Sequence, residues 1–182
     1  LVDVLIPRGG AGLINAIVEG AKIPVIETGT GNCHLFVDAS ADLQQALEIM
    51  INAKTQRCSV CNALETLLVH RDVADDFLPR AVDALHQNGV LVHGDDQVRS
   101  VSSDVVPVKP EDYEAEWLTM DLSARVVDGI DDALAHIRRY STGHSETIVT
   151  ADRASAERFT GEVDAAVVLV NASSRFVDGG EF

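Results

Sequence analysis

The chain has few positive charges and no long apolar run. Its 182 residues include 14 Lys and Arg but 29 Asp and Glu, so the formal net charge is −15. Nucleic-acid phosphates need clustered Lys and Arg, and the sequence has no basic face to supply them. It also has no stretch of roughly eighteen or more apolar residues that could form a membrane-spanning helix. We therefore expect neither nucleic acid nor a membrane as a partner.

Cysteine is scarce as well. The three cysteines are Cys33, Cys58 and Cys61. An odd, low count indicates a reducing, cytoplasmic setting rather than a disulfide framework. The opening LVDVLIPRGG lacks the basic region of a signal peptide. The chain begins without Met and closes on the Gly-rich FVDGGEF, so we expect a piece of a longer protein.

What is present is typical of a globular α/β protein. Hydrophobic residues make up 46% of the chain, which is long enough for one domain with a sizeable core. Apolar runs typical of buried strands alternate with segments of helical periodicity. This pattern predicts a three-layer α/β/α fold with a mostly parallel sheet. The expected strands are 1–6, 23–28, 33–38, 64–70, 90–94, 124–129, 145–150 and 165–171. The expected helices are 11–21, 40–55 (capped by Ser40 or Asp42), 72–89, 130–141 and 152–162, with residues 95–120 irregular.

Two cysteines stand close together in KTQRCSVCNALETLLVH, residues 54–70. A zinc ribbon would need a second pair, and Cys33 stands alone without a His cluster, so no metal site is predicted. A redox C-x-x-C should open a helix, whereas Cys61 precedes a strand-like run. Two interpretations remain: buried inert thiols, or a loop nucleophile whose own N–H faces the oxyanion that it creates. The residues alone leave both open.

Several long blocks resemble the γ-glutamyl phosphate reductases, a family within the aldehyde dehydrogenase superfamily. They follow one another along nearly the whole chain: LIPRGGAGLI, PVIETGTGNCHLFVD, NAKTQRCSVCNALETLLVH, EDYEAEWL, RYSTGHSETIVT and VNASSRFVDGGEF. Ordered blocks of this length are more specific than any single motif. The resemblance implies an aldehyde-dehydrogenase-like catalytic domain at 23–182, truncated at its carboxyl end. Residues 1–22 would be the tail of a cofactor-binding domain.

The resemblance places the family's nucleophile on Cys61, in VCNALET, and gives Cys58 no role. It implies NADPH-dependent reduction of γ-glutamyl phosphate to glutamate 5-semialdehyde and phosphate, in cytoplasmic proline biosynthesis, through a thioester on Cys61. Each step passes through an oxyanion, for which the Cys61 N–H is one donor. The superfamily's second donor, an Asn side chain, would lie upstream of residue 1. Cys33, in GNCHLFVD, is expected to serve strand packing.

Further site residues are implied in the same way. Glu27, in VIETG, matches a superfamily glutamate and is a candidate to accept the Cys61 proton or to hold a water. Gly9 and Gly10, in the turn PRGG, match a segment that touches the cofactor's pyrophosphate. Glu116, in EAEWL, matches the glutamate that binds the nicotinamide ribose. The plainer alternatives are a solvated carboxylate for Glu27 and an ordinary tight turn for the glycines.

The loop NASSRF, after the last expected strand, is a candidate substrate anchor. Ser173, Ser174 and Arg175 offer two hydroxyls and a bidentate cation, which suit a carboxylate or a phosphate. A solvated turn is the alternative. His144, in TGHSE, receives no role beyond a surface or supporting position.

The expected partner is a small molecule, γ-glutamyl phosphate, with NADP(H) as the cofactor. A homo-oligomer and the glutamate kinase that supplies the substrate are candidate protein partners. We expect the 182 residues alone to be inactive or nearly so, because most of the cofactor domain would be missing. The alternatives are a hydrolytic aldehyde dehydrogenase, which would not depend on phosphate, and a non-catalytic module that retained the fold.

Overall fold

The computed structural model describes residues 2–26 and 30–177, and the chain divides between Thr30 and Gly31 into two compact units. Unit 1 is residues 1–30 and unit 2 is residues 31–182. Unit 1 contains one described helix, α1 (Ala11–Gly20), and one isolated parallel bridge between Leu5 and Val25. The strands expected at 1–6 and 23–28 are therefore reduced to this single bridge among the described residues. That the first 22 residues belong to a cofactor-binding domain stays a prediction.

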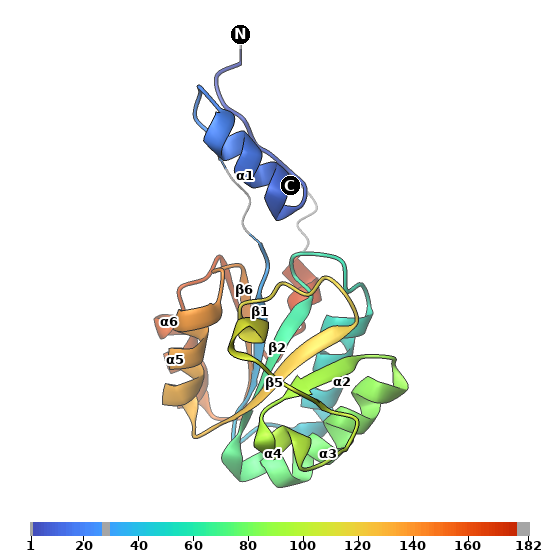
Figure 1. Ribbon diagram of the computed structural model, residues 1–182. Helices are drawn as coiled ribbons and strands as arrows, with labels where there is room; N and C mark the ends of the chain where they lie inside the picture. The colour runs from blue at the N-terminus through green and yellow to red at the C-terminus, as the bar shows by residue number, and fades with distance from the viewer. Residues whose placement is uncertain (1, 27–29, 178–182) are drawn as a thin grey trace. The chain divides into compact units, whose positions relative to one another are not determined.

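Unit 2 is built on a seven-stranded sheet, drawn in Figure 1, with the strand order β4-β3-β5-β2-β1-β6-β7. All of its recorded strand pairs are parallel. The strands are β1 (Cys33–Val37), β2 (Leu64–His70), β3 (Leu91–Gly94), β4 (Val106–Pro107), β5 (Asp121–Val127), β6 (Ser145–Val149) and β7 (Val167–Val170).

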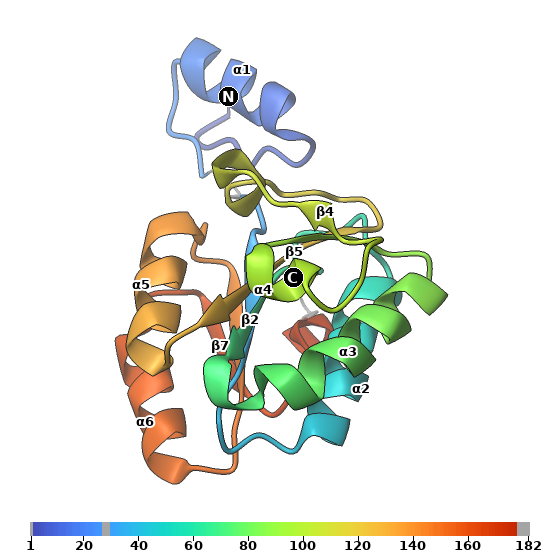
Figure 2. The same cartoon turned by 60° about the horizontal axis from the view of Figure 1, so that its bottom comes forward.

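Helices cover both faces of the sheet (Figures 1 and 2). The pair α2 (Leu43–Thr55) and α3 (Arg71–Gln87) lies on one face, and α5 (Ile130–Tyr140) and α6 (Arg153–Glu162) lie on the other. The shorter elements are α4 (Asp96–Arg99), η1 (Pro110–Tyr113) and η2 (Ser174–Val177). The α/β/α fold class with a parallel sheet is thus confirmed.

The two faces explain why the strand sequences are apolar without alternation. On β1, Leu35 and Val37 pack into the core under α2 and α3, whereas Phe36 packs into the core under α5 and α6. Successive side chains of a strand point to opposite faces. Since both faces are buried, every position favours an apolar residue. Within the described residues, no helix is both long enough and apolar enough to cross a lipid bilayer.

The helix cap, the short elements and one strand boundary differ from what the sequence predicts, because local polar contacts determine some of them. Asp42 caps α2 by accepting hydrogen bonds from the N–H groups of Gln44 and Gln45. Ser40 instead bonds the side chains of Asp38 and Thr150. The segment 95–120 is more ordered than expected, because it holds α4, β4 and η1. Elements of two to four residues are too short to show a hydrophobic period. Strand β5 begins three residues early, at Asp121.

Candidate active site

Two of the sequence-predicted site residues, Cys61 and Glu116, lie at the amino edge of the sheet together with Gly31 and His144. Cys61 lies in the loop before β2, Glu116 in the loop before β5, and His144 directly before β6. Gly31 precedes β1 in the same way. Because the strands are parallel, their amino ends meet at one edge. Residues from four distant stretches of sequence are thereby brought together.

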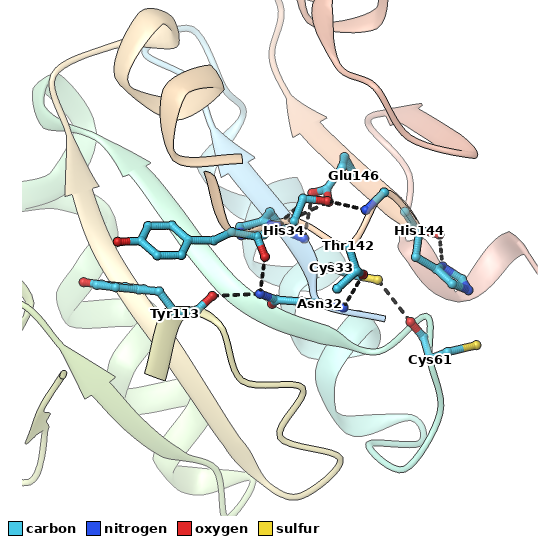
Figure 3. Close-up of polar contacts among 12 residues, drawn as sticks. Asn32, Cys33, His34, Cys61, Tyr113, Thr142, His144 and Glu146 are labelled. Atoms are coloured by element: carbon cyan, nitrogen blue, oxygen red, sulfur yellow. Dashed lines mark hydrogen bonds and ion pairs between the residues drawn. The ribbon is translucent and has the colours of Figure 1, made fainter. Parts of the chain in front are cut away.

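Cys61 is exposed, whereas the main chain behind it is tightly enclosed. A Cβ added at Gly31 would lie 1.5 Å from the Cys61 carbonyl oxygen, so only glycine allows this approach of two backbones. The buried thiol of Cys33 donates a hydrogen bond to the same oxygen, with an S–O distance of 3.2 Å. Figure 3 shows this contact, with the Cys61 sulfur directed away from Cys33. The exposed thiol is what the nucleophile interpretation requires.

The next peptide of the loop is held from another direction. The Ser174 hydroxyl, on η2, donates to the Asn62 carbonyl oxygen at 2.7 Å, and both residues are buried. Ser173 is also buried, and its hydroxyl accepts the N–H of Arg175. The NASSRF loop therefore does reach the cysteine loop. The Ser174 hydroxyl is already engaged there by the main chain.

Arg175, unlike Ser173 and Ser174, is partly exposed. Its Nε donates to Oε1 of Gln56, at the end of α2, over 2.9 Å. The guanidinium carries five N–H donors, so within the described residues this contact leaves donors on its terminal nitrogens for a further acceptor. The structure thus leaves Arg175 chemically able to hold an anion.

Glu116 is tied to the same backbone. Its Oε1 accepts the N–H of Gly31 at 2.7 Å, and Gly31 in turn rests against Cys61. The neighbouring Trp117 stacks on His93, with ring centroids 4.4 Å apart, and donates to the Ser123 hydroxyl. The Glu116 carboxylate and the cysteine loop are therefore linked through one glycine.

A buried ion pair that the sequence does not predict supports the Glu116 loop. Lys54 on α2 lies 2.6 Å from Oε2 of Glu65 on β2, and both side chains are fully buried. The other oxygen of Glu65 accepts the N–H of Leu118, whose φ of 54° is in the left-handed region. Burial raises the pKa of Glu65 from 4.5 to about 7, although Lys54 opposes the shift. The block NAKTQR contained Lys54, but nothing in a single sequence shows that its amine turns inward.

A second buried polar group fixes the loops around β1 and β6. Glu146 accepts the N–H of His34 at 2.9 Å and the Ser141 hydroxyl at 2.5 Å. The Asn32 side chain donates to the carbonyl oxygens of Tyr113 and Tyr140. These contacts, several of which are drawn in Figure 3, join the loops on both sides of Cys33. They explain why the block GNCH is polar at a place that the strand pattern would fill with apolar residues.

His144 remains a supporting residue. Its Nδ1 is 2.8 Å from the Ser145 hydroxyl, and burial lowers the pKa of its imidazole. Cys58 is partly exposed in the turn before Cys61. No group of three or more His, Cys, Asp or Glu side chains in the described part of the chain is arranged to hold a metal ion.

The remaining predicted residues lie in or near unit 1. Gly10 is the N-cap of α1, where no side chain caps the helix, and an added Cβ would meet nothing within 4 Å. Gly9 has a φ of 152°, and an added Cβ would lie 2.9 Å from a Leu13 methyl group. The predicted turn before a helix is thus present. Glu27 lies outside the described residues.

A family model for the aldehyde dehydrogenase family matches residues 9–104, which is more than half of the chain. The chain belongs to the aldehyde dehydrogenase family. The matched segment includes β1, β2, both helices between and after them, and the Cys61 loop. The resemblance identified from the blocks is confirmed at this level.

Individual relatives of this aldehyde dehydrogenase family member carry a narrower name. The γ-glutamyl phosphate reductase of Thermobifida fusca is 62% identical over 182 residues, which are 100% of this chain and 44% of that protein. The crystal structure of the Thermotoga maritima γ-glutamyl phosphate reductase has a TM-score of 0.96 and 50% identity, over 100% of this chain and 44% of that chain. The Saccharomyces cerevisiae enzyme of that name has a TM-score of 0.67 and 30% identity, over 98% and 45% of the two chains. The chain thus spans less than half the length of these relatives.

Proposed function

We propose that this chain carries the nucleophilic cysteine of a γ-glutamyl phosphate reductase. The proposed reaction is the NADPH-dependent reduction of γ-glutamyl phosphate to glutamate 5-semialdehyde and phosphate, in cytoplasmic proline biosynthesis. The observation that carries the proposal is the Cys61 loop, which exposes the thiol and buries the carbonyl groups behind it. The 62% identity to the Thermobifida fusca reductase over the whole chain supports the same substrate.

The proposed chemistry begins when the Cys61 thiol loses its proton. The thiolate then attacks the acyl carbon of γ-glutamyl phosphate, the C–O bond to phosphate breaks, and a thioester remains on Cys61. Addition of hydride to the thioester carbonyl gives a tetrahedral hemithioacetal. Its collapse breaks the C–S bond, releases the aldehyde and restores the thiolate. Each addition places negative charge on the former carbonyl oxygen, where backbone N–H groups of the loop can stabilise it.

Other residues of unit 2 have proposed roles in binding. Arg175 would hold the substrate's carboxylate or phosphate through its terminal nitrogens. Ser174 would act by holding the Asn62 carbonyl, as its contact indicates, and Ser173 by shaping the same loop. Glu27 keeps its proposed part in proton transfer.

The reduced nicotinamide cofactor would supply the hydride. Glu116 fits a ribose contact, because Gly31 occupies one carboxylate oxygen and, among the described contacts, the other takes no donor. Gly9 and Gly10 fit a phosphate contact, because the start of α1 is free of side-chain caps. A preference for NADP over NAD is part of the proposal. So are a homo-oligomer and an interaction with glutamate kinase.

A chimera tests the proposed function. The matching 182 residues of the Thermobifida fusca reductase are replaced by this chain. Oxidation of glutamate 5-semialdehyde by NADP is then measured through the NADPH that forms. We expect activity that requires phosphate, that is lost in Cys61→Ala and that persists in Cys58→Ala. The isolated chain should show little or no turnover. Activity without phosphate would indicate a hydrolytic dehydrogenase instead, and retained activity in Cys61→Ala would refute the nucleophile.

A further inference from the structure

The main chain at Cys61 is contacted by a second cysteine, Cys33. Cys33 is the first residue of β1 and is fully buried. Its sulfur lies 3.2 Å from the Cys61 carbonyl oxygen, 28 residues away in sequence, with the thiol as donor. Packing alone would be served equally well by an apolar side chain of the same size, which could not make this contact.

We propose that Cys33 is a positioning residue: its buried thiol holds the peptide plane between Cys61 and Asn62 in the orientation that the nucleophile needs. This inference rests on the proposed role of Cys61. Gly31 restricts the same carbonyl oxygen sterically, and Ser174 holds the next one along. Cys33 supplies the attractive contact that defines where the first oxygen points.

The geometry of the peptide carries the effect to the reaction. In a trans peptide the C=O and N–H bonds point in opposite directions. With the Cys61 oxygen turned toward Cys33, the N–H of Asn62 points away from Cys33. A fixed N–H beside the attacking sulfur can stabilise the oxyanion that forms in acyl transfer, and it costs no reorganisation at that moment.

Cys33 is suited to this role because it stays protonated. Burial, followed by the negative charge of Glu146, raises the pKa of the Cys33 thiol well above its usual value. A thiol that keeps its proton remains a hydrogen-bond donor, and it does not compete as a nucleophile. The two cysteines therefore differ in function because one is enclosed and the other is exposed.

Three substitutions separate the hydrogen bond from packing. Cys33→Val keeps most of the volume and removes the donor, Cys33→Ala removes both, and Cys33→Ser keeps a donor. Val37→Ala is the matched control, since Val37 is fully buried at the far end of β1. Each variant is made in the 182-residue chain in a Cys58→Ser background, so that Cys61 is the exposed thiol.

Two reagents then separate positioning from general reactivity. Acylation of Cys61 by p-nitrophenyl acetate passes through an oxyanion, whereas alkylation by iodoacetamide does not. We expect Cys33→Val and Cys33→Ala to lower the ratio of acylation to alkylation rates by about threefold or more, in keeping with one lost hydrogen bond. Cys33→Ser should recover most of the ratio, and Val37→Ala should leave it unchanged. An unchanged ratio in Cys33→Val, with Cys61 still reactive, would overturn the proposal.

A spectroscopic measurement distinguishes this proposal from the proposed function. The carbonyl ¹³C resonance of Cys61 should move in Cys33→Val and return toward its original position in Cys33→Ser, whether or not Cys61 reacts. If, in the unsubstituted chain that retains Cys58, Cys61 reacts no faster than Cys58 with either reagent, the nucleophile assignment fails and the positioning role fails with it. If Cys61 is reactive but its carbonyl resonance is the same in all variants, only the role of Cys33 is overturned.

Discussion

At the scale of single residues, Gly31 is the position where the structure least tolerates a side chain. Gly31 is buried, donates its N–H to Glu116, and lies where any Cβ would overlap the Cys61 carbonyl group. It thus joins a proposed cofactor contact to a proposed nucleophile. No rearrangement of a flexible side chain can relieve the overlap, because the opposing atoms are backbone.

Gly31→Ala should displace the Cys61 loop. We expect acylation of Cys61 to fall by about 10²-fold, the cost typical of an approximately 1 Å misplacement. The measurement is the rate of nitrophenol release from p-nitrophenyl acetate. Gly161→Ala is the control, because Gly161 lies on α6 with nothing within 4 Å of an added Cβ. That change should leave the rate unchanged and stabilise the helix by about 0.5–1 kcal/mol.

Single residues also show which parts of the candidate site can be predicted from the sequence. Cys61 was identified because its block resembled a family, and its exposure on a loop before β2 agrees with that reading. Gly31 and Cys33 lay inside a recognised block, yet their contacts with residue 61 depend on how β1 and β2 pair. A single sequence does not give the distance between residues about thirty positions apart, so it predicts a packing role for Cys33 and neither of the two contacts.

At the scale of elements, the buried pair of Lys54 on α2 and Glu65 on β2 connects a helix to the sheet and to the Glu116 loop. Removing Glu65 leaves the Lys54 ammonium buried without a counter-charge, and removing Lys54 leaves the Glu65 carboxyl buried without its partner. Breaking a buried pair in this way typically costs about 3–5 kcal/mol. We expect Lys54→Met and Glu65→Gln each to lower the free energy of unfolding by about that amount. The double variant should recover most of it. Urea unfolding of the four proteins measures the coupling, and simple additivity would contradict the pair's role.

The same pair predicts a pH dependence. The pKa of Glu65 is raised from 4.5 to about 7 by burial, so the folded state keeps a proton that the unfolded state releases. Its contribution to stability is therefore fully present below about pH 4.5 and is lost as the pH rises to about 7. Relative to the double variant, the wild type should lose stability between these pH values. A difference in unfolding free energy that stays flat or grows with pH would refute the raised pKa.

Elements were predicted well where they are long and enclosed. The strands β1, β2 and β6 and the helices α2, α3, α5 and α6 agree with their apolar periodicity to within a few residues. The elements within 95–120 could not be predicted from the sequence, because α4 has four residues and β4 has two. Their positions depend on Asp95, which caps α4 and also accepts the N–H of Val126 on β5. Hydrogen bonds between residues far apart in the sequence produce no hydrophobic periodicity from which an element could be predicted.

At the scale of the whole molecule, the two units differ in how much surface they bury. The described residues of unit 1 include two buried residues, Pro7 and Ile14. Six of its large apolar side chains are exposed: Val2, Val4, Ile6, Leu13, Val18 and Ile26. Unit 2 contains both hydrophobic cores. The stability of the chain should therefore reside in unit 2.

A chain of residues 31–182 tests this difference. We expect its Tm to lie within a few degrees of that of the 182-residue chain, because both hydrophobic cores are retained. Hydrogen exchange should likewise be fast at the α1 amides and slow in β1, β2 and β5. A large drop in Tm on deletion would show that unit 1 contributes to the stability of unit 2.

Because the candidate site lies at the amino edge of the sheet, the carboxyl edge can accept insertions without touching it. There the turns from strand to helix are closed by their own contacts, such as the Asp38 carboxylate bonded to Ser40 and Thr150. In the turn from β5 to α5, Asp128 has 73% of its side chain exposed and pairs with Arg71 at the surface. An epitope or a reporter domain inserted beside Asp128 would stand a full strand length from the Cys61 thiol. This edge is where the protein offers room for engineering or for acquiring new attachments.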